Sequence, residues 1–416
     1  MEKIAAAPPT SAIRLRDLLT VPVIVASLGY FVDIYDLILF SIVRVSSLKS
    51  IGLQGQDLLD QGVFLLNMQM GGMLLGGILW GILGDKKGRV KILFGSIFLY
   101  SLANIANGFV GSLGGYALWR FIAGIGLAGE LGAGVTLVLE SLPKGSRGYG
   151  TMIVASVGVT GAILANVIAK HFEWRMAYFI GGGLGLLLLI LRIGVYESGM
   201  YREMEGTHVR KGDFFSLFTK RAHFFKYLKS ILIGLPIWFA VGILVTFSPE
   251  FAKALGVTAP VNAGEAVMFC YLGLVFGDFA SGFLSQFFAS RKKIVLLFQI
   301  LSGFMITGYF MLKGVSPALF YAHCAAIGFS VGYWAIFITI AAEQFGTNLR
   351  ATVASTVPNF IRGMVIPITF SFQFARERLG IIGGAAVVGV ICLAVSFYAL
   401  SHLEETFHKD LNYLEE

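Results

Sequence analysis

The sequence predicts an all-α integral membrane protein, with twelve transmembrane helices arranged as two pseudo-symmetric six-helix bundles. Three observations lead to this fold class: an apolar composition, twelve long apolar segments, and a repeat between the two halves of the chain. Hydrophobic residues make up 56% of the 416 residues and charged residues only 13%, about half the charged share of a typical soluble protein. The segments have the length of helices and lack the ten-residue alternation of membrane β-strands.

Twelve apolar segments run along the chain, and each provides the roughly 20 residues that a helix needs to cross the bilayer core. They fall near 18–43, 61–84, 90–110, 113–141, 147–169, 175–196, 228–251, 263–288, 293–312, 316–345, 349–375 and 380–402. An even number of spans places both termini on one side of the membrane. That side collects about 21 Lys and Arg residues and the other about 8, and cytoplasmic loops are the ones enriched in these residues. Both termini are therefore predicted to be cytoplasmic.

The spans divide the chain into two bundles joined by a polar segment. The predicted parts are a cytoplasmic tail at 1–17, an N-terminal six-helix bundle at 18–197, a cytoplasmic linker at 198–227, a C-terminal six-helix bundle at 228–403 and a second cytoplasmic tail at 404–416. No Asn-x-Ser/Thr sequon occurs in the sequence, which favours a bacterial protein. The expected location is therefore the cytoplasmic (inner) membrane, which the chain crosses many times.

The two predicted bundles share a pattern of charged residues. Glu140 ends the fourth span and Arg147 opens the fifth, while Glu343 ends the tenth and Arg350 opens the eleventh. The spacing from glutamate to arginine is seven residues in both bundles, and the two pairs are 203 residues apart. Duplicated halves are typical of secondary transporters, whose substrate site lies between the halves near the bilayer midplane.

The first span carries two carboxylates, Asp33 and Asp36, inside an apolar run. Residues three apart lie on one side of a helix, so both side chains point the same way. An ionisable group at membrane depth costs about 2.5–3.5 kcal/mol on insertion scales, and such groups usually face a bundle interior or a water-filled path. We therefore expect the two acids to be functional.

The fourth span supplies candidate partners for these acids, Arg120 and Glu130. With a rise of about 1.5 Å per residue, Arg120 lies level with Asp36, and Glu130 lies about one turn below Asp33. We expect an Asp36–Arg120 ion pair, with Asp33 and Glu130 near the midplane. Burial and a like-charged neighbour favour the protonated form of a carboxyl group, so these four residues are the candidates for proton coupling, with Asp33 as the carrier. The alternative is a fixed charge cluster that ties the first helix to the fourth.

Candidate substrate-binding residues lie mainly in the second half. In the eleventh span, Arg362 lies near the midplane, with Asn359 one turn earlier. The arginine either binds a substrate carboxylate bidentately or pairs with Asp278, which lies at a similar depth in the eighth span. The aromatic residues that either line the cavity or pack between helices are Tyr30, Tyr35, Trp238, Tyr333 and Trp334.

The loop between the second and third spans carries a motif. It reads Gly81-Ile82-Leu83-Gly84-Asp85-Lys86-Lys87-Gly88-Arg89-Val90-Lys91. This has the form G-x-L-x-D-x-x-G-R-x-K/R and resembles the loop signature of the major facilitator superfamily. The resemblance implies a cytoplasmic latch that holds the two halves together in the outward-open state. The charged residues expected to stabilise the cytoplasmic closure are Asp85, Arg89, Glu140, Arg147, Glu343 and Arg350.

The first and fourth spans resemble the metabolite:proton symporter branch of that superfamily. The branch typically carries E-W-Y-D-F in its first helix, where this chain has Asp33-Ile34-Tyr35-Asp36-Leu37. Its fourth helix reads roughly R-x-x-Q-G-x-x-x-G-G-E, and this chain begins that pattern at Arg120 and ends it at Glu130, with Ala123 in place of Gln. The resemblance implies that spans one, four, seven and ten line the cavity.

These features predict a secondary active transporter that carries a small organic anion or zwitterion together with a proton by alternating access. The alternatives are a proton-independent facilitator or sugar-porter-like carrier, and a proton-driven exporter. The expected partners are the solute, protons and the lipid bilayer, and the chain is expected to act as a monomer. The net charge of +8 arises mainly from short loops between spans and is explained by topology, so no nucleic-acid partner is expected.

No chemistry beyond transport is predicted. The sequence contains no nucleotide-binding loop of the form G-x-x-x-x-G-K-S/T, so ATP is not expected to drive the protein. The cysteines Cys270, Cys324 and Cys392 fall in apolar runs without metal-ligand spacing. No Ser/His/Asp constellation occurs at matching depth. We therefore expect no enzyme activity, no cofactor and no metal.

Overall fold

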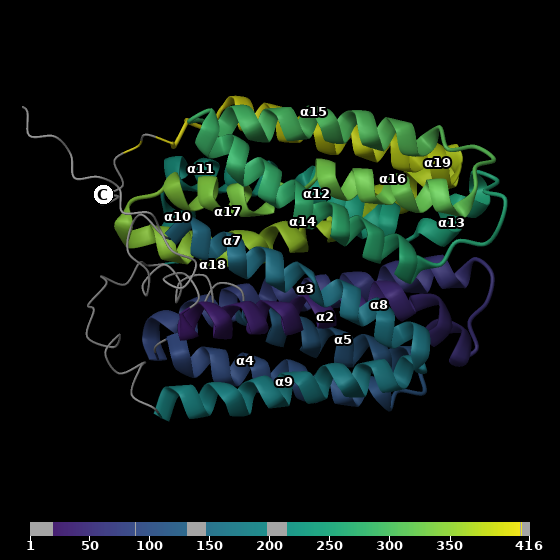
Figure 1. The fold of residues 1–416 in the computed structure, drawn as a ribbon, viewed down its shortest axis with the longest axis horizontal. Coiled ribbons are helices and arrows are strands. Elements are labelled where there is room, and N and C mark those ends of the chain that lie inside the picture. The colour runs from purple at the N-terminus through teal and green to yellow at the C-terminus, as the bar shows by residue number, and fades with distance from the viewer. Residues whose placement is uncertain (1–19, 88, 131–146, 198–213, 408, 410–416) are drawn as a thin grey trace, which may run out of the picture.

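The protein forms a bundle of helices in two halves that lie against each other. The computed structural model describes residues 20–87, 89–130, 147–197, 214–407 and 409, and no strand occurs among them. Helices from the first half of the chain form one layer and helices from the second half form the other (Figure 1). We call the described residues up to 197 the N half and those from 214 the C half.

The N half contains a helix for each of the first six predicted spans. These helices are α2 (Val21–Ser50), α3 (Asp57–Lys87), α4 (Arg89–Gly108), α5 (Leu113–Leu127), α7 (Arg147–Val159), α8 (Gly161–His171) and α9 (Trp174–Glu197). The fifth span is shared between α7 and α8, which are separated by Thr160. The end of the predicted fourth span, 131–141, lies outside the described residues.

The C half contains helices for the remaining six spans, several of which are broken. These helices are α10 (Ser216–Thr219), α11 (Arg221–Leu232), α12 (Leu235–Phe239), the π-helix η2 (Ala240–Val245), α13 (Ser248–Ala254), α14 (Ala263–Phe287), α15 (Arg291–Phe310), α16 (Pro317–Ser330), α17 (Trp334–Glu343), α18 (Thr347–Gly363) and α19 (Val365–Ser401). The tenth span is divided between α16 and α17.

Length and composition account for the predicted number of spans. Eight helices of the described part are long and apolar enough to cross a membrane, and the bent pair Arg221–Leu232 and Leu235–Val245 makes a ninth. One of the eight is the 50-residue stretch Thr352–Ser401, which at about 1.5 Å per residue is more than twice as long as a bilayer core is thick. Gly380 interrupts this stretch with a φ of 70°, at the predicted start of the twelfth span. The two parts of this stretch, together with α4 and α5, complete the twelve spans.

The seventh span is bent by 42° between its two helical segments. Pro236 lies in the first turn of α12, directly after the break. Proline lacks the N–H that would continue the preceding helix, so a bend at this position has a local cause.

Close packing of α3 against α5 depends on two glycines four residues apart. A methyl group on Gly72 would overlap the carbonyl oxygen of Phe121, and one on Gly76 would overlap that of Ile125. The spacing is that of a G-x-x-x-G motif, which lets membrane helices approach closely.

The same arrangement recurs in the C half, between α14 and α16. A methyl group on Gly273 would overlap the carbonyl oxygen of Ala325, and one on Gly277 would overlap that of Phe329. These helices form the eighth and tenth spans, as α3 and α5 form the second and fourth. The internal repeat inferred from the loop charges is thus also present in the helix packing.

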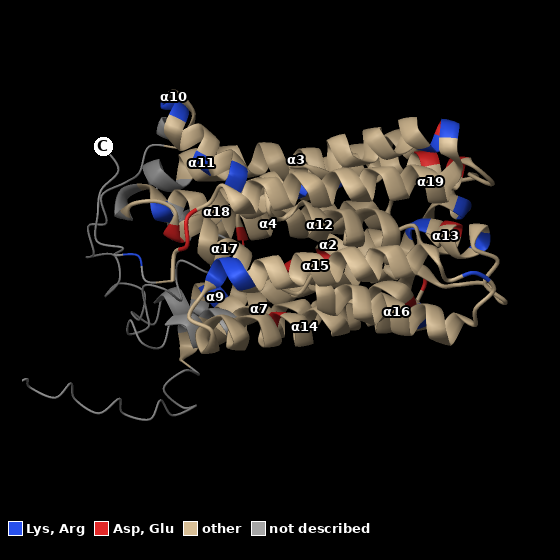
Figure 2. Ribbon diagram, turned by 90° about the horizontal axis from the view of Figure 1, so that it is seen from above, with Lys and Arg blue, Asp and Glu red and all other residues tan. Residues whose placement is uncertain are grey.

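The halves meet along two symmetry-related seams. The second span, α3, packs against the eleventh, α18, and the fifth span, α7 and α8, packs against the eighth, α14. Figure 2 shows charged residues gathered mainly at the two ends of the bundle. We call the end where α2 finishes and α3 begins the outer end, and the opposite end the inner end.

Candidate functional site

Three ion pairs join the two halves at the outer end. They are Arg44–Glu250 at 2.7 Å, Lys170–Glu265 at 2.7 Å and Arg376–Asp60 at 2.6 Å. They bring together the outer ends of α2, α3 and α8 in the N half with α13, α14 and α19 in the C half. The halves are therefore held together on this side.

The Arg44 pair is the most deeply buried of the three. The Arg44 side chain has no exposed surface, and the Glu250 side chain is 21% exposed. Arg44 also donates a hydrogen bond to the Leu58 carbonyl at 2.8 Å, and its guanidinium lies 4.6 Å from the centre of the Phe247 ring. By contrast, the Lys170 side chain is 65% exposed.

A small cavity lies between the two halves, deeper than these pairs. Its volume is about 30 Å³, which is room for only a water molecule or two. Helices of both halves line it, through Tyr30, Ile34, Leu37, Val159, Ile237, Trp238, Val241, Tyr271, Leu274, Trp334 and Arg362. The cavity has to enlarge before a metabolite fits, so the structure is closed around this position.

Asp33 and Arg362 face each other across the interface, close to the cavity. The Asp33 Oδ2 atom of α2 lies 3.7 Å from the Arg362 Nη2 atom of α18, and neither side chain is more than 1% exposed. This separation is an ion pair but exceeds the 2.7–3.2 Å of a hydrogen bond. Among the described residues, neither carboxylate oxygen of Asp33 has a hydrogen-bond partner, and neither Nε nor Nη1 of Arg362 has one. The pair therefore joins the two halves, but it leaves hydrogen-bonding atoms of both the carboxylate and the guanidinium unsatisfied.

Two indole rings lie close to the Arg362 guanidinium. Its Cζ atom lies 5.9 Å from the centre of the Trp238 ring and 5.7 Å from that of Trp334. The two rings meet edge to face, with centroids 6.3 Å apart. Arginine over an aromatic face is a favourable cation–π arrangement. The result is a buried cation beside a pair of indole rings, with Nε and Nη1 free of hydrogen bonds to the described residues.

Arg120 does not form the direct ion pair with Asp36 that the depth estimate predicted. Its Nη2 atom donates to Gln69 Oε1, and its guanidinium lies 4.4 Å from the centre of the Phe40 ring. Neither oxygen of Asp36 has a hydrogen-bond partner in the part of the chain that the structure describes, and the side chain is fully buried. Helical rise gives the height of a side chain but not the direction in which it points, and α5 directs Arg120 toward α3.

Glu130 pairs with an arginine that the sequence interpretation overlooked. Its Oε1 and Oε2 atoms accept from Arg192 Nη2 at 2.5 Å and Nη1 at 3.0 Å. Arg192 lies on α9 and also donates to the Val25 carbonyl at 3.4 Å. A lone arginine in the apolar sixth span was the signal that could have identified it, because a charge at membrane depth needs a partner.

The remaining substrate candidates divide into two groups. Tyr30, Trp238, Trp334 and Arg362 line the cavity. The other three donate hydrogen bonds to the backbone instead: Tyr35 to Ala177 at 2.8 Å, Tyr333 to Ile233 at 3.1 Å, and Asn359 to Ala128 at 2.8 Å. Tyr35 and Tyr333 therefore follow the packing alternative, and Asn359 joins the two halves.

The alternative partner for Arg362 is not used either. Asp278 accepts a hydrogen bond from the backbone N–H of Ala335 at 3.2 Å, at the start of α17. The ion pair formed by Arg362 is with Asp33. The partners expected for Arg362 from the sequence were a substrate carboxylate or Asp278. Asp33, which lies in the other half of the protein and faces Arg362, was not among them.

Only part of the predicted cytoplasmic gate lies among the described residues. Glu140 and the side chains of Asp85, Arg89 and Arg147 lie outside them. Glu343 contacts Arg291 at 3.4 Å, a residue of its own half. Arg350, the other gate candidate of this half, donates to the Phe345 carbonyl at 3.3 Å.

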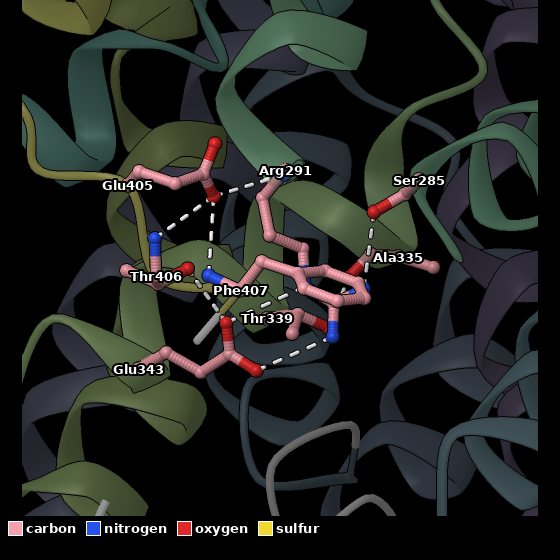
Figure 3. Close-up of polar contacts among 8 residues, drawn as sticks. All are labelled: Ser285, Arg291, Ala335, Thr339, Glu343, Glu405, Thr406 and Phe407. Atoms are coloured by element: carbon pink, nitrogen blue, oxygen red, sulfur yellow. Dashed lines mark hydrogen bonds and ion pairs between the residues drawn. The ribbon is translucent and has the colours of Figure 1, made fainter. Parts of the chain in front are cut away.

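Glu343 belongs to a polar network at the inner end that includes the segment after α19 (Figure 3). Thr406 donates to Glu343 at 2.6 Å, and the Arg291 guanidinium lies 5.2 Å from the centre of the Phe407 ring. Glu405 accepts from the backbone N–H of Arg291 at 3.0 Å, at the N-terminus of α15. Partial burial disfavours the charged form of Glu405, but hydrogen bonds from Ser290 and the backbone outweigh it and hold the pKa below its usual value.

Comparison with known proteins supports the sequence resemblance. A family model described as the Major Facilitator Superfamily matches residues 26–369. A Haemophilus influenzae protein assigned to metabolite transport is 28% identical over 388 residues, covering 86% of this chain and 91% of that protein. The niacin transporter NiaP of Acinetobacter baylyi is 24% identical, covering 79% of this chain and 80% of that protein. The crystal structure of a D-xylose-proton symporter superposes with a TM-score of 0.67 at 16% identity, covering 94% of this chain and 99% of that one.

Proposed function

The chain belongs to the major facilitator superfamily, and from that premise we propose that it takes up a small organic anion or zwitterion together with a proton. As a family member it is a multi-pass membrane transporter of small metabolites and not an enzyme. The finer assignment, proton-coupled symport by alternating access, is our proposal. We place it in the cytoplasmic (inner) membrane as a monomer, with both termini in the cytoplasm.

The observation that carries the proposal is Arg362 in the wall of the cavity between the halves. It is a buried cation whose Nε and Nη1 atoms have no hydrogen-bond partner among the residues that the structure describes. A guanidinium presents donors in a planar fork that matches a carboxylate. Trp238 and Trp334 both lie within 6 Å of it, where the flat part of a ligand would contact them. The chemistry fits a small monocarboxylate with a flat body.

The niacin transporter among the relatives supports the same class of solute, because niacin is a ring that carries one carboxyl group. Nicotinate and benzoate are therefore our first probes. Nicotinamide is a matched neutral compound, since it keeps the ring and replaces the carboxylate with an amide.

Proton coupling is assigned to the buried charges of the N half. Asp33, Asp36 and Glu130 place three carboxyl groups in the interior, each no more than 1% exposed. An ionised carboxylate without hydrogen bonds is costly in a low-dielectric interior, and neither Asp33 nor Asp36 has one. Arg120 and Arg192 lie beside this group and supply compensating charge. A proton that enters the cluster from outside and leaves it inside would couple transport to the proton gradient.

Alternating access requires a closure at each end of the bundle. The ion pairs at the outer end supply one closure in this conformation. We assign the inner closure to the predicted gate residues Asp85, Arg89, Glu140, Arg147, Glu343 and Arg350. The Arg291 and Thr406 contacts of Glu343 would hold it in place within the C half.

Uptake into proteoliposomes tests the proposal. Purified protein should accumulate labelled nicotinate or benzoate against its gradient when the lumen is alkaline, and a protonophore should abolish the accumulation. The Arg362→Lys variant keeps the charge but loses the planar fork, and we expect at least a tenfold loss of uptake. Equal uptake of nicotinamide, or uptake that only equilibrates the solute and is unaffected by the protonophore, would favour a facilitator.

A further inference from the structure

We propose that the N half contains a hydrated path of its own for protons, which runs from the outer surface to Asp36 between α2, α4, α5 and α9, apart from the substrate cavity. Internal water molecules bound by Tyr100, Asn104 and Asn107 of α4 form this path. The inference rests on the proposed function, because it takes proton coupling as its premise. It deepens that function by assigning the route along which the proton arrives.

The three polar side chains lie along one face of α4. Asn104 and Asn107 follow Tyr100 by four and seven residues, a spacing that keeps all three on the same side of a helix. Each is no more than 1% exposed. The Tyr100 hydroxyl and both polar atoms of each asparagine side chain have no hydrogen-bond partner among the described residues. Buried polar groups without a protein partner are usually hydrogen-bonded to internal water, so this face is suited to hold water.

The fold itself does not require these amides, because the corresponding helix of the C half lacks them. The helices α4 and α15 are each 20 residues long. Aligned from their first residues, they pair Asn104 with Ile306 and Asn107 with Tyr309. Ile306 is a buried apolar residue, and the Tyr309 hydroxyl donates to the Leu244 carbonyl at 2.9 Å. At these two positions, the N half alone has unsatisfied polar atoms, which points to a role in function.

Asp36 lies beside this polar face and points into the N half. Its carboxylate is close enough to the Asn104 side chain to interact with it. A methyl group on Gly181 of α9 would overlap Asp36 Oδ1, so the carboxylate lies against that helix. Asp36 is about a third of a turn around α2 from the face that Ile34 and Leu37 present to the substrate cavity. A proton can therefore reach Asp36 from a side that the solute does not use.

The polar face leads to the outer surface. Asn107 lies in the last turn of α4, which ends at Gly108, and Phe109 and Gly111 in the segment after it are exposed. Asn107 lies about 4.5 Å further out than Asn104, at about 1.5 Å per residue. The two asparagines therefore span the distance from Asp36 to the exposed segment.

Proton transfer along this path needs no free ion in the interior. A hydronium ion at the outer surface becomes water, each internal water accepts one proton and releases another, and the Asp36 carboxylate becomes a carboxylic acid. The titratable groups that act on Asp36 are Asp33 and Tyr35 of its own helix, Tyr100 of α4, Arg120 of α5 and Tyr178 of α9. Arg120 is the one cation of this set, and a fixed cation opposes the passage of a free hydronium ion. Asp36 is thus the first carboxylate that the proton meets.

Two modes of nicotinate transport in proteoliposomes test the path. Net uptake needs a proton from outside in every cycle, whereas exchange of external for internal nicotinate can proceed with the proton still bound. Asn104→Leu and Asn107→Leu keep the approximate volume but interrupt the hydrogen bonds, so net uptake should fall at least about tenfold while exchange stays within about twofold of the wild type. Asn107→Ser, which can still bind water, should keep most of the net uptake.

Ser101→Ala provides the matched control on the same helix. Ser101 is buried like the asparagines, but its hydroxyl donates to the Ile97 carbonyl at 2.7 Å. Both transport modes should therefore be unchanged in this variant. Full net uptake in both leucine variants would overturn the path. Loss of exchange together with net uptake would overturn it too, because it would show that the asparagines serve packing.

A measurement on the wild type tests the path even if the leucine variants fail to fold. Hydroxyl radicals that X-rays generate from bound water modify the side chains next to it. Tyr100 and Tyr309 are both fully buried, and of the two, Tyr100 has the hydroxyl without a partner among the described residues. Tyr100 should be modified several times faster than Tyr309, and equal rates would overturn the path. Wild-type nicotinate accumulation that ignores the proton gradient would instead refute the proposed symport, and the path with it.

Discussion

The buried pair Arg44–Glu250 should control how often the outer end opens. The Glu250→Gln substitution removes the anion and leaves the fully buried Arg44 guanidinium in place. Removal of one member of a buried pair costs about 3–5 kcal/mol. The figure is smaller here, because the Glu250 side chain is 21% exposed and Arg44 keeps its bond to the Leu58 carbonyl. We expect about 2 kcal/mol, which is about a 30-fold shift toward the outer-open state.

Cysteine labelling measures this shift. The native cysteines Cys270, Cys324 and Cys392 are free and buried, and they would be replaced by alanine. A single cysteine at Leu37, in the cavity wall, then reacts with a membrane-impermeant maleimide only when the outer end opens. Its labelling rate should rise about 30-fold in the Glu250→Gln protein, in proportion to the open population.

The exposed pair Lys170–Glu265 provides the matched control. Exposed pairs contribute about 0–1 kcal/mol, so Glu265→Gln should raise the labelling rate less than about fivefold. An unchanged rate in Glu250→Gln, or an equal rise in both variants, would refute the assignment of Arg44–Glu250 as the main outer closure.

Three further predictions concern packing, the second buried pair and the inner end. Gly273→Ala, which drives a methyl group into a carbonyl oxygen, should lower the melting temperature strongly or abolish folding, whereas Gly282→Ala, with nothing within 4 Å, should not. Glu130→Gln should destabilise the protein by about 3–5 kcal/mol, and adding Arg192→Leu should restore most of that loss in thermal unfolding. Because the pKa of Glu405 is lowered in the folded state, its stabilisation is present above the unfolded-state pKa of about 4.3 and is lost as pH falls through the folded-state value. The Glu405→Gln protein should thus be less stable than the wild type at pH 7 by less than about 1 kcal/mol. This difference should disappear as the pH falls through the folded-state pKa of Glu405, and a constant difference would contradict the assignment.

The spans could be predicted from the sequence because hydropathy is a local property. Each apolar segment has to become a helix in a bilayer, since no other structure satisfies its backbone there. Even the division between the last two spans was predicted correctly, close to Gly380, whose φ of 70° suits glycine. The repeat between the halves was visible in loop charges and reappears in the glycines Gly72 and Gly273.

The pairing of buried charges could not be predicted in the same way. Asp36 and Arg120 were placed at one height, but a pair also needs both helices to direct their side chains toward each other. Glu130 forms its ion pair with Arg192 of α9, a helix that the depth estimate did not identify as a neighbour. Arg362 was predicted to lie near the midplane, and its partner Asp33 comes from the other half. Helix rotation and the contact between halves decide such pairs, and neither is encoded in a short window of sequence.

The pairing of proton and anion flux is the most direct test of the central claim. Proteoliposomes with a pH dye in the lumen would report proton entry while labelled nicotinate uptake is counted in the same sample, with protein-free vesicles correcting for diffusion of the undissociated acid. The account predicts about one proton for each nicotinate that enters, at a rate unaffected by membrane potential, because the two charges cancel. Nicotinate entry without acidification of the lumen, or entry driven by the potential alone, would contradict it.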